Sequence, residues 1–551
     1  MANHTPEAEP AANTRHGLRA PSIKQLTLSL LLLGLVWRVL LYVLGFPIWG
    51  DEAFVAVDFV VRGYREMVQP SLYGQIVPVV FMWAELAVSR ALGFSEWALH
   101  WLPTLAGIAA LLLFWRFAQQ VLPRRPAFLA VGIFAASYYI VRHGAEVKPY
   151  ITDLLVSLGL TMLAWAVHQR PNSVRHWIAL ILFGGTAVWC SYPAAFVGGS
   201  VGLLLTWLLW RGRFRAGVLA GWLAFGVVLC GSFLAMFLTI GKPHAEFAAR
   251  LTDTWAVTFP PLTRPWQLPF WLYAMHTGLM LAYPHGGTAP GSVVTFLCVL
   301  IGAVRLARRQ PALLLLLLGP LPLAFIAAAA HAYPYGGSAR VTLYMAPAFC
   351  LLAGLGLFAG LEFLVPRAVA LVRRKSARPV TRGECVRGAL LLAAASLALI
   401  PICTMTGELL WPYQSLASYR SREAVRSVAQ QTSPGDRWVI FNAQEKVPYA
   451  PYLGDWRGVG GQFVFDVLRF APVPITWAPP PETIQAAPGK RVWLLVYRAE
   501  NEKKGVDFPD EQLAAYVATV AERLGPPGHE SYVVKDERGK LETVDAYRFG
   551  R

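Results

Sequence analysis

The chain has 551 residues, of which 56% are hydrophobic, and its formal net charge is +17 at pH 7. A single soluble domain is excluded, because a chain this long and this apolar cannot bury its apolar side chains in one core. Nucleic-acid binding is disfavoured, because most of the basic residues form short clusters between apolar runs. Repeated apolar runs of about twenty residues instead predict a polytopic membrane protein.

The first apolar run, at about 26–46, is long enough to cross a bilayer, and no small-residue cleavage site follows it. We therefore expect an uncleaved anchor after a cytoplasmic tail of residues 1–25. In all, residues 26–406 predict about eleven transmembrane helices. The other ten are expected at about 97–117, 127–142, 150–167, 176–190, 193–210, 216–240, 291–306, 311–330, 341–364 and 387–406.

One more apolar segment, at about 76–92, is short and carries Pro78, Glu85 and Arg90. If it lies in the interface without crossing, every basic cluster between the spans falls on the side of the N-terminal tail. Positively charged loops face the cytoplasm, so this arrangement is self-consistent, and a crossing segment would reverse it. The segment is therefore predicted to be a juxtamembrane helix. The loops at about 47–96, 142–149, 242–290 and 331–340 are then extracytoplasmic.

Residues 407–551 differ in composition and alternate helical with strand-like patterns. Helices are predicted at 420–430 and 511–524, and buried strands at 438–441 and 492–497. A hairpin is predicted between 532–534 and 543–547. We expect a small extracytoplasmic α/β domain, and the segment contains no phosphate-binding glycine loop and no nucleophile elbow.

The first span is followed by Asp51 and Glu52, two carboxylates at the edge of the membrane. Charges there are costly unless they are solvated, paired or used. The apolar spacing that follows predicts an amphipathic helix, lying on the membrane, that begins at this pair. An ionised carboxylate at a helix N-terminus can accept a proton from a hydroxyl or bind a cation. The alternative is a simple helix cap.

Three other extracytoplasmic segments carry candidate binding groups. Lys148, in the sequence Glu-Val-Lys-Pro-Tyr, can hold a lipid phosphate or can be a snorkelling lysine paired with Glu146. A glycine pair before Arg340 can approach a phosphate or sugar, or can form an ordinary tight turn. His244 and Glu246 have no strict metal-ligand spacing, so a solvated loop is favoured there.

Together these segments resemble the GT-C membrane glycosyltransferases, and within them the family-39, protein-mannosyltransferase-like group that includes the RgtA/B/C/D-like enzymes. The order and spacing of the motifs match the group over roughly residues 30–365. The motifs are 50–54 (Gly-Asp-Glu-Ala-Phe), 73–78 (Tyr-Gly-Gln-Ile-Val-Pro), 93–100 (Gly-Phe-Ser-Glu-Trp-Ala-Leu-His), 146–150 (Glu-Val-Lys-Pro-Tyr) with Asp153, and 335–338 (Tyr-Gly-Gly-Ser) with Arg340.

The resemblance implies a GT-C fold and a reaction outside the cytoplasm with a polyprenyl-phosphate sugar as donor. It assigns Asp51 as the general base, Glu52 as its acidic catalytic neighbour and Lys148 to the donor phosphate. His100 stands where the group usually has an arginine. The substrate-binding residues implied are Gln75, Glu146, Lys148, Tyr150, Tyr335 and Arg340. No cofactor and no metal site is expected, and a divalent cation is possible without support from the sequence.

The predicted function is therefore an inverting glycosyltransferase of the plasma (inner) membrane. It would move a hexosyl or pentosyl group from a lipid-phosphate donor to a hydroxyl of a lipid, glycan or protein. The chain has no Rossmann-like glycine fingerprint, which disfavours a nucleotide-sugar donor. Two alternatives stay open: a lipid-linked sugar flippase or transporter, and a non-catalytic partner in envelope-glycan assembly. Arg38 and Asp153, inside predicted spans, keep the transporter alternative open.

Overall fold

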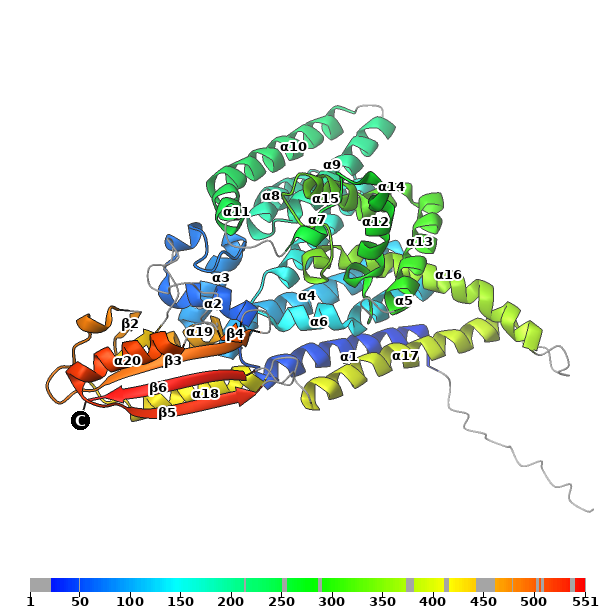
Figure 1. The fold of residues 1–551 in the computed structure, drawn as a ribbon. Helices are drawn as coiled ribbons and strands as arrows, with labels where there is room; N and C mark the ends of the chain where they lie inside the picture. The colour runs from blue at the N-terminus through cyan, green and yellow to red at the C-terminus, as the bar shows by residue number, and fades with distance from the viewer. Residues whose placement is uncertain are drawn as a thin grey trace, which may run out of the picture.

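The computed structural model of the chain describes most of its residues (Figure 1). The expected N-terminal tail, 1–25, lies almost wholly outside the described residues, which begin at 21. The described ranges are 21–48, 50–212, 215–249, 255–285, 290–372, 381–410, 416–441, 461–477, 479–501, 505–506, 510–535 and 541–550.

Helices make up the described part of the chain up to Leu410. They are α1 (Ile23–Leu44), α2 (Gly50–Val61), α3 (Val79–Leu92), α4 (Glu96–Val121), α5 (Arg124–Ala136), α6 (Tyr138–Arg142), α7 (Tyr150–Gln169), α8 (Val174–Cys190), α9 (Ala194–Arg211), α10 (Ala216–Met236), α11 (Lys242–Ala249), α12 (Leu268–Thr277), α13 (Pro290–Arg309), α14 (Pro311–Leu318), α15 (Pro320–Ala329), α16 (Ala346–Val372) and α17 (Arg382–Leu410). Short 3-10 turns join several of them, including η2 (His143–Ala145), η4 (Ala256–Thr258) and η7 (Arg340–Met345).

Eight described helices are long and apolar enough to cross a membrane, or nine if the bent pair α5–α6 forms one span. The protein is an integral membrane protein. Each of the eleven predicted spans coincides with a helix or with two consecutive helices, but the count of eight or nine is lower. Of the eleven predicted spans, the two outside the count are α8 and α13, and α8 has only 17 residues, the lower limit for crossing the hydrocarbon. Helix α3 has 14 residues and is not among the candidate spans.

The transmembrane core is built around α16, which packs against α5 and α13. Small residues permit this contact. A Cβ atom on Gly354 would overlap the backbone of Ala130 in α5, and one on Gly356 would overlap the carbonyl of Cys298 in α13. Close packing of this kind is how membrane helices associate without a hydrophobic driving force between them. Helices α1 and α17 run side by side along one edge of the bundle (Figure 1).

The chain ends in a small α/β domain whose sheet has the strand order β2-β1-β3-β6-β5. Strand β1 is parallel to β2 and β3, while β6 is antiparallel to β3 and β5, and β4 pairs with the end of β3. The bounds are β1 (Arg437–Phe441), β2 (Ile475–Trp477), β3 (Val492–Asn501), β4 (Gly505–Val506), β5 (Gly528–Lys535), β6 (Leu541–Phe549), α18 (Leu416–Gln431), α19 (Gly461–Phe470) and α20 (Asp510–Leu524). The predicted helices, strands and hairpin are confirmed, and α19, β2 and β4 were not predicted.

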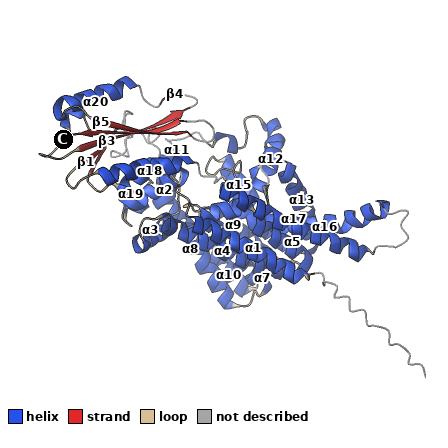
Figure 2. Cartoon of the chain, turned by 90° about the horizontal axis from the view of Figure 1, so that it is seen from below, coloured by secondary structure: helices blue, strands red, loops and turns tan. Residues whose placement is uncertain are grey.

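Helices cover both faces of this sheet because its strands alternate their side chains. Trp438 and Ile440 point into a core that includes α18 and α19, whereas Val439 and Phe441 point to the face covered by α20. Seen from below, α18, α19 and α2 lie on one side of the sheet, and α20 lies on the other (Figure 2). The sheet therefore has one face turned toward the start of the membrane domain.

Helix α2 departs in part from the amphipathic surface helix predicted for it. Val55, Ala56, Val57 and Phe59 are all buried, whereas Val61 at its end is 47% exposed. The partners of the buried residues include apolar side chains of α19 in the C-terminal domain. The periodicity of α2 did not reveal that another domain covers part of the helix, because an apolar pattern reports burial without saying what covers it.

Candidate active site

The carboxylate of Asp51 lies between two cations that come from distant parts of the chain. Arg340 Nη1 donates a hydrogen bond to Asp51 Oδ2 at 2.6 Å, and Lys148 Nζ lies 3.4 Å from Oδ1. Lys148 also donates to Gln75 Oε1 at 2.7 Å. The structure thus brings together four residues of the predicted site. One carboxylate and two cations leave this cluster with a surplus positive charge.

Local structure fixes each of these side chains. Asp51 occupies the first turn of α2, where the helix dipole favours a carboxylate. Lys148 sits in the turn before α7, whose geometry is set by a bond from its own amide to the Glu146 carbonyl at 2.7 Å. Arg340 is the first residue of η7 and follows Gly337, whose φ of 75° suits glycine.

Lys148 is 2% exposed, whereas Asp51 is 23% and Arg340 28% exposed. Burial lowers the pKa of Lys148, and the nearby Arg340 lowers it further, while the Asp51 carboxylate opposes both effects. The partly exposed Asp51 and Arg340 are open to a ligand from the solvent side. The cluster therefore has a buried cation at its base and an accessible carboxylate and guanidinium at its mouth.

Aromatic rings flank the Arg340 guanidinium. Its centre lies 5.6 Å from the ring of Trp255 and 6.0 Å from that of Tyr150, within the range of cation–π attraction. Tyr150 thus belongs to the surroundings of the cluster through Arg340. Trp255 was not predicted as a site residue, because nothing in its loop distinguishes it from the neighbouring interfacial tryptophans.

Glu52 occupies a different environment, although it is the next residue. Its side chain has no exposed surface, and Oε1 accepts from the Val147 amide at 2.6 Å and lies 3.0 Å from His100 Nε2. Burial raises the pKa of Glu52, and the contact with His100 partly opposes that effect. Glu52 therefore joins α2 to α4 and to the turn that carries Lys148. In the structure His100 therefore pairs with Glu52. This is the position at which the resembling family usually has an arginine.

Glu146 does not contact Asp51. Its carboxylate binds His143 Nδ1 at 2.7 Å and Arg142 Nε at 3.1 Å. Burial opposes its ionisation, but His143 and Arg142 together hold the pKa of Glu146 at about 2. Glu146 thus organises the turn before Lys148.

Tyr335 also lies apart from the Asp51 contacts. Its hydroxyl is 3.3 Å from His276 Nε2, and its ring packs against Trp271 and Phe325. Its backbone amide donates to the carbonyl of Thr258, at the end of η4. Tyr335 therefore anchors the turn before Arg340 on its neighbouring loop. The sequence grouped Tyr335 and Arg340 in one motif, and the structure gives them separate surroundings.

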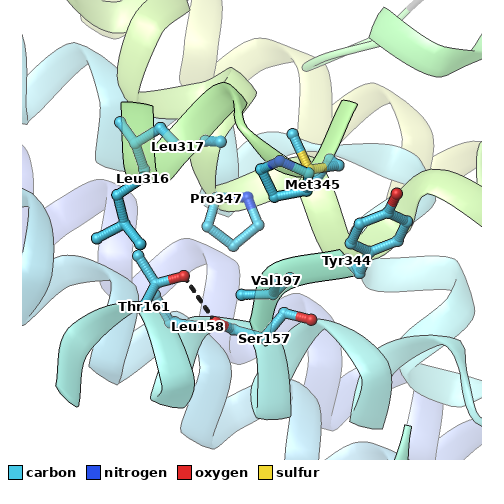
Figure 3. Close-up of a pocket in the computed structure, with 11 residues that line it drawn as sticks. Ser157, Leu158, Thr161, Val197, Leu316, Leu317, Tyr344, Met345 and Pro347 are labelled. Carbon is cyan, nitrogen blue, oxygen red and sulfur yellow. Dashed lines mark hydrogen bonds between the residues drawn. The ribbon is translucent and has the colours of Figure 1, made fainter. Parts of the chain in front are cut away.

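A row of polar residues continues from Tyr150 along one face of α7: Asp153, Ser157 and Thr161. Ser157 and Thr161 line a small cavity with Tyr344, and Thr161 donates to the Ser157 carbonyl at 2.8 Å (Figure 3). The cavity volume is ≈ 20 Å³, enough for about one water and too small for a sugar. A larger, mostly apolar cavity of ≈ 630 Å³ lies between α16 and α17 and does not include the Asp51 cluster.

The described residues contain no group of three or more His, Cys, Asp or Glu side chains placed to hold a metal ion. The two loop residues considered as ligands are apart: His244 Nε2 lies 3.2 Å from the Val68 carbonyl, and Glu246 pairs with Lys242. Asp51 is the carboxylate in the described site that could take a cation, and it is already held by Lys148 and Arg340.

The family model described as dolichyl-phosphate-mannose-protein mannosyltransferase matches residues 77–240, a stretch that includes His100 and Lys148. Among solved structures, ArnT from Cupriavidus metallidurans in the apo state has a TM-score of 0.52 at 13% identity, over 93% of this chain and 97% of that one. No curated protein sequence matches the chain.

This protein has a GT-C fold. The same ArnT bound to undecaprenyl phosphate has a TM-score of 0.51 at 12% identity, over 95% of this chain and 97% of that one. The apo oligosaccharyltransferase of Archaeoglobus fulgidus has a TM-score of 0.50 at 12% identity, over 92% of this chain and 69% of that one. The GT-C fold thus includes the C-terminal domain, since the match to ArnT extends over nearly all of both chains.

Proposed function

We propose that this GT-C protein is an inverting glycosyltransferase. It moves a sugar from a polyprenyl-phosphate donor to a hydroxyl acceptor on the extracytoplasmic side of the plasma membrane. One observation carries the proposal: the Asp51 carboxylate shares a cluster with two cations, Lys148 and Arg340. A base and a phosphate site within one cluster are what this reaction requires.

Asp51 accepts the proton of the acceptor hydroxyl as the acceptor oxygen forms a bond to the anomeric carbon. The bond from that carbon to the phosphate oxygen breaks, and its electron pair leaves with the phosphate. A phosphodiester with one negative charge becomes a phosphate monoester with up to two. Lys148 and Arg340 stabilise this developing charge. A single displacement, with the base and the leaving group on opposite faces of the sugar, inverts the anomeric centre.

The two cations have to change partner during this reaction. Each of them contacts Asp51 in the structure, so the carboxylate oxygens are occupied before the donor arrives. A donor phosphate that takes over these contacts frees the oxygens to accept a hydrogen bond from the acceptor hydroxyl. An ammonium has three N–H donors, so Lys148 can keep its bond to Gln75 while it exchanges Asp51 for phosphate. Donor binding thereby activates the base.

Glu52 acts in this proposal as a positioning residue. Its carboxylate has no exposed surface, so it fixes α2 against α4 and against the Lys148 turn. Tyr150 orients Arg340 through its ring, while Glu146 and Tyr335 shape the turns before Lys148 and Arg340.

A lipid-linked donor is supported by the matching family, whose name includes dolichyl-phosphate-mannose, and by the similar ArnT structure bound to undecaprenyl phosphate. Such a donor reaches the site through the bilayer. The extracytoplasmic orientation follows from the positive-inside rule, which assigns the basic loops between the spans to the cytoplasm. The identity of the sugar and of the acceptor is left to the experiment.

The test uses the purified chain in lipid nanodiscs with a panel of synthetic undecaprenyl-phosphate hexoses and pentoses and a set of glycan, lipid and peptide acceptors. The expected result is a new glycosidic bond of inverted configuration with release of undecaprenyl phosphate. Asp51→Asn should reduce the rate by about 10²–10⁴-fold with the thermal unfolding temperature unchanged. The rate should be the same with and without EDTA, because Lys148 and Arg340 supply the positive charge.

Full activity of the Asp51→Asn variant would overturn the role of Asp51. A flippase would instead move the lipid-linked sugar across a vesicle bilayer without forming a bond. The buried Arg38 on α1 and Asp153 on α7 are the residues whose substitution would then matter. A non-catalytic partner would do neither, and would bind the lipid or glycan unchanged.

A further inference from the structure

We propose that the C-terminal domain positions the catalytic base, through a clamp formed by Glu96 of α4 with Arg422 and Arg469 of the C-terminal domain. This inference rests on the proposed function for the role of Asp51. The structural part of the inference is that the clamp holds α19 against α2. This part rests on contacts alone and does not depend on the proposed function. It assigns a function to a domain whose sequence shows no catalytic motif.

The clamp is a carboxylate shared by two guanidinium groups. Arg469 Nη1 donates to Glu96 Oε1 at 2.7 Å. Arg422 Nη2 lies 2.6 Å from the same oxygen, as an ion pair without the angle of a hydrogen bond. Arg422 Nε also donates to Asp466 Oδ1 at 3.3 Å, which ties α18 to α19 within the domain. Glu96 and Arg422 are 10% exposed and Arg469 17%, so solvent screens this network little.

Beside the clamp, α19 closes the apolar core around α2. Phe463, Val464, Phe465 and Val467 are fully buried in the same cluster as Ala53, Val55, Ala56 and Val57 of α2. Consecutive residues of α2 are buried, and consecutive residues point to different sides of a helix. The helix is therefore held by the C-terminal domain on one side and by the membrane domain on another. Asp51 stands on the first turn of this helix. Any shift of α19 therefore moves the base.

Arg340 does not share this support, because it lies on η7, which packs on α7 and α16. The Lys148 turn shares it in part: Val147 is buried in the same cluster as α2 and α19, and its amide donates to Glu52 of α2. Arg340 is thus carried by the membrane domain, while the base is carried by a helix wedged between the two domains. Loosening the clamp should displace the base relative to Arg340 and leave Arg340 in place.

The experiment compares Arg469→Ala and Arg469→Lys with a matched control, Arg498→Ala, in the full chain in nanodiscs. Arg498 also pairs with a carboxylate, Asp545, but within the sheet of the C-terminal domain. Three quantities are measured: hydrogen exchange of the α2 amides, affinity for undecaprenyl phosphate, and transfer rate at saturating donor.

Arg469→Ala should speed exchange of the α2 amides and lower the saturated transfer rate, each by about tenfold or more. Its affinity for undecaprenyl phosphate should fall by much less than the transfer rate, because Arg340 does not move. Arg469→Lys should recover part of both losses, since an ammonium keeps the charge but not the planar geometry. Arg498→Ala should leave α2 exchange and transfer unchanged.

Unchanged exchange in α2 after Arg469→Ala would overturn the clamp, whatever the transfer rate does. A loss of affinity for undecaprenyl phosphate equal to the loss of rate would also overturn it, because the whole site would then have been disturbed. If α2 exchange rises as expected but the wild-type chain transfers no sugar from any donor, the clamp stands and the proposed function fails.

Discussion

The two sides of α2 carry neighbouring carboxylates with opposite surroundings. Asp51 is 23% exposed and paired with cations that a phosphate can take over. Glu52 has no exposed surface and binds a histidine and a backbone amide that no ligand can reach. The comparison shows that chemistry is set by environment: the same functional group is exchangeable on one side of the helix and structural on the other.

The comparison predicts opposite effects for the two carboxylates: substitution of Glu52 should lower stability, and substitution of Asp51 should lower the transfer rate. Glu52→Gln keeps the shape but weakens the contact with His100 and the Val147 amide. It should cost about 1–3 kcal/mol of stability, because a buried network is left partly unsatisfied. Thermal unfolding measures this cost, and Asp51→Asn is the control that should lose rate without losing stability. Equal stability of both variants would contradict the division between them.

A second test concerns the buried cation. Lys148→Met removes the charge at the base of the site and should weaken binding of undecaprenyl phosphate by about tenfold or more, since a charge-assisted hydrogen bond is lost. Because burial lowers the pKa of Lys148, the wild-type ammonium loses its proton at a lower pH than an exposed lysine. Wild-type affinity should therefore fall as the pH rises through that lowered pKa.

The affinity for undecaprenyl phosphate is measured as a function of pH for the wild type and for Lys148→Met. The comparison shows whether Lys148 causes the decline at high pH. The variant has no ammonium to titrate, so its weaker binding should lose this alkaline decline. A decline of the same size in the variant would assign the titration to another group.

A smaller effect is expected at Glu146, which shapes the turn before Lys148. Its pKa is about 2, below the ordinary value of a glutamate, so it stabilises the folded state above the unfolded pKa. Glu146→Gln should be less stable than wild type at pH 7 by about 1–3 kcal/mol. The difference in stability between wild type and variant should narrow as the pH falls toward 2, since protonation removes the charge of the Glu146 carboxylate. A stability difference that stays constant over this range would show that this charge does not cause it.

Much of the site was predictable from the order of short motifs. Asp51, Gln75, Lys148 and Arg340 were predicted from separate segments, and the structure joins them through three contacts. Their roles stay predictions. The eleven apolar segments, the helices α18 and α20 and the strands β1, β3, β5 and β6 were predicted because their hydrophobic periodicity is strong.

What the sequence did not reveal depends on contacts between distant segments. The pairing of Glu52 with His100 needs the relative placement of α2 and α4, which no local pattern encodes. Helix α19 was missed because its short apolar run, Phe463–Val464–Phe465, fits a buried strand as well as a helix. Without α19 the burial of α2 could not be foreseen, and its periodicity was assigned to a membrane surface.

The pair formed by Arg340 and Asp51 joins residues 289 positions apart. During synthesis at about 5–20 residues per second, roughly 15–60 s separate the emergence of the carboxylate from that of its arginine. Throughout that interval the growing chain contains Asp51 but lacks Arg340. Under the proposed function, a nascent or truncated polypeptide without Arg340 would be inert toward lipid-linked sugars. Activity would then arise late in biogenesis.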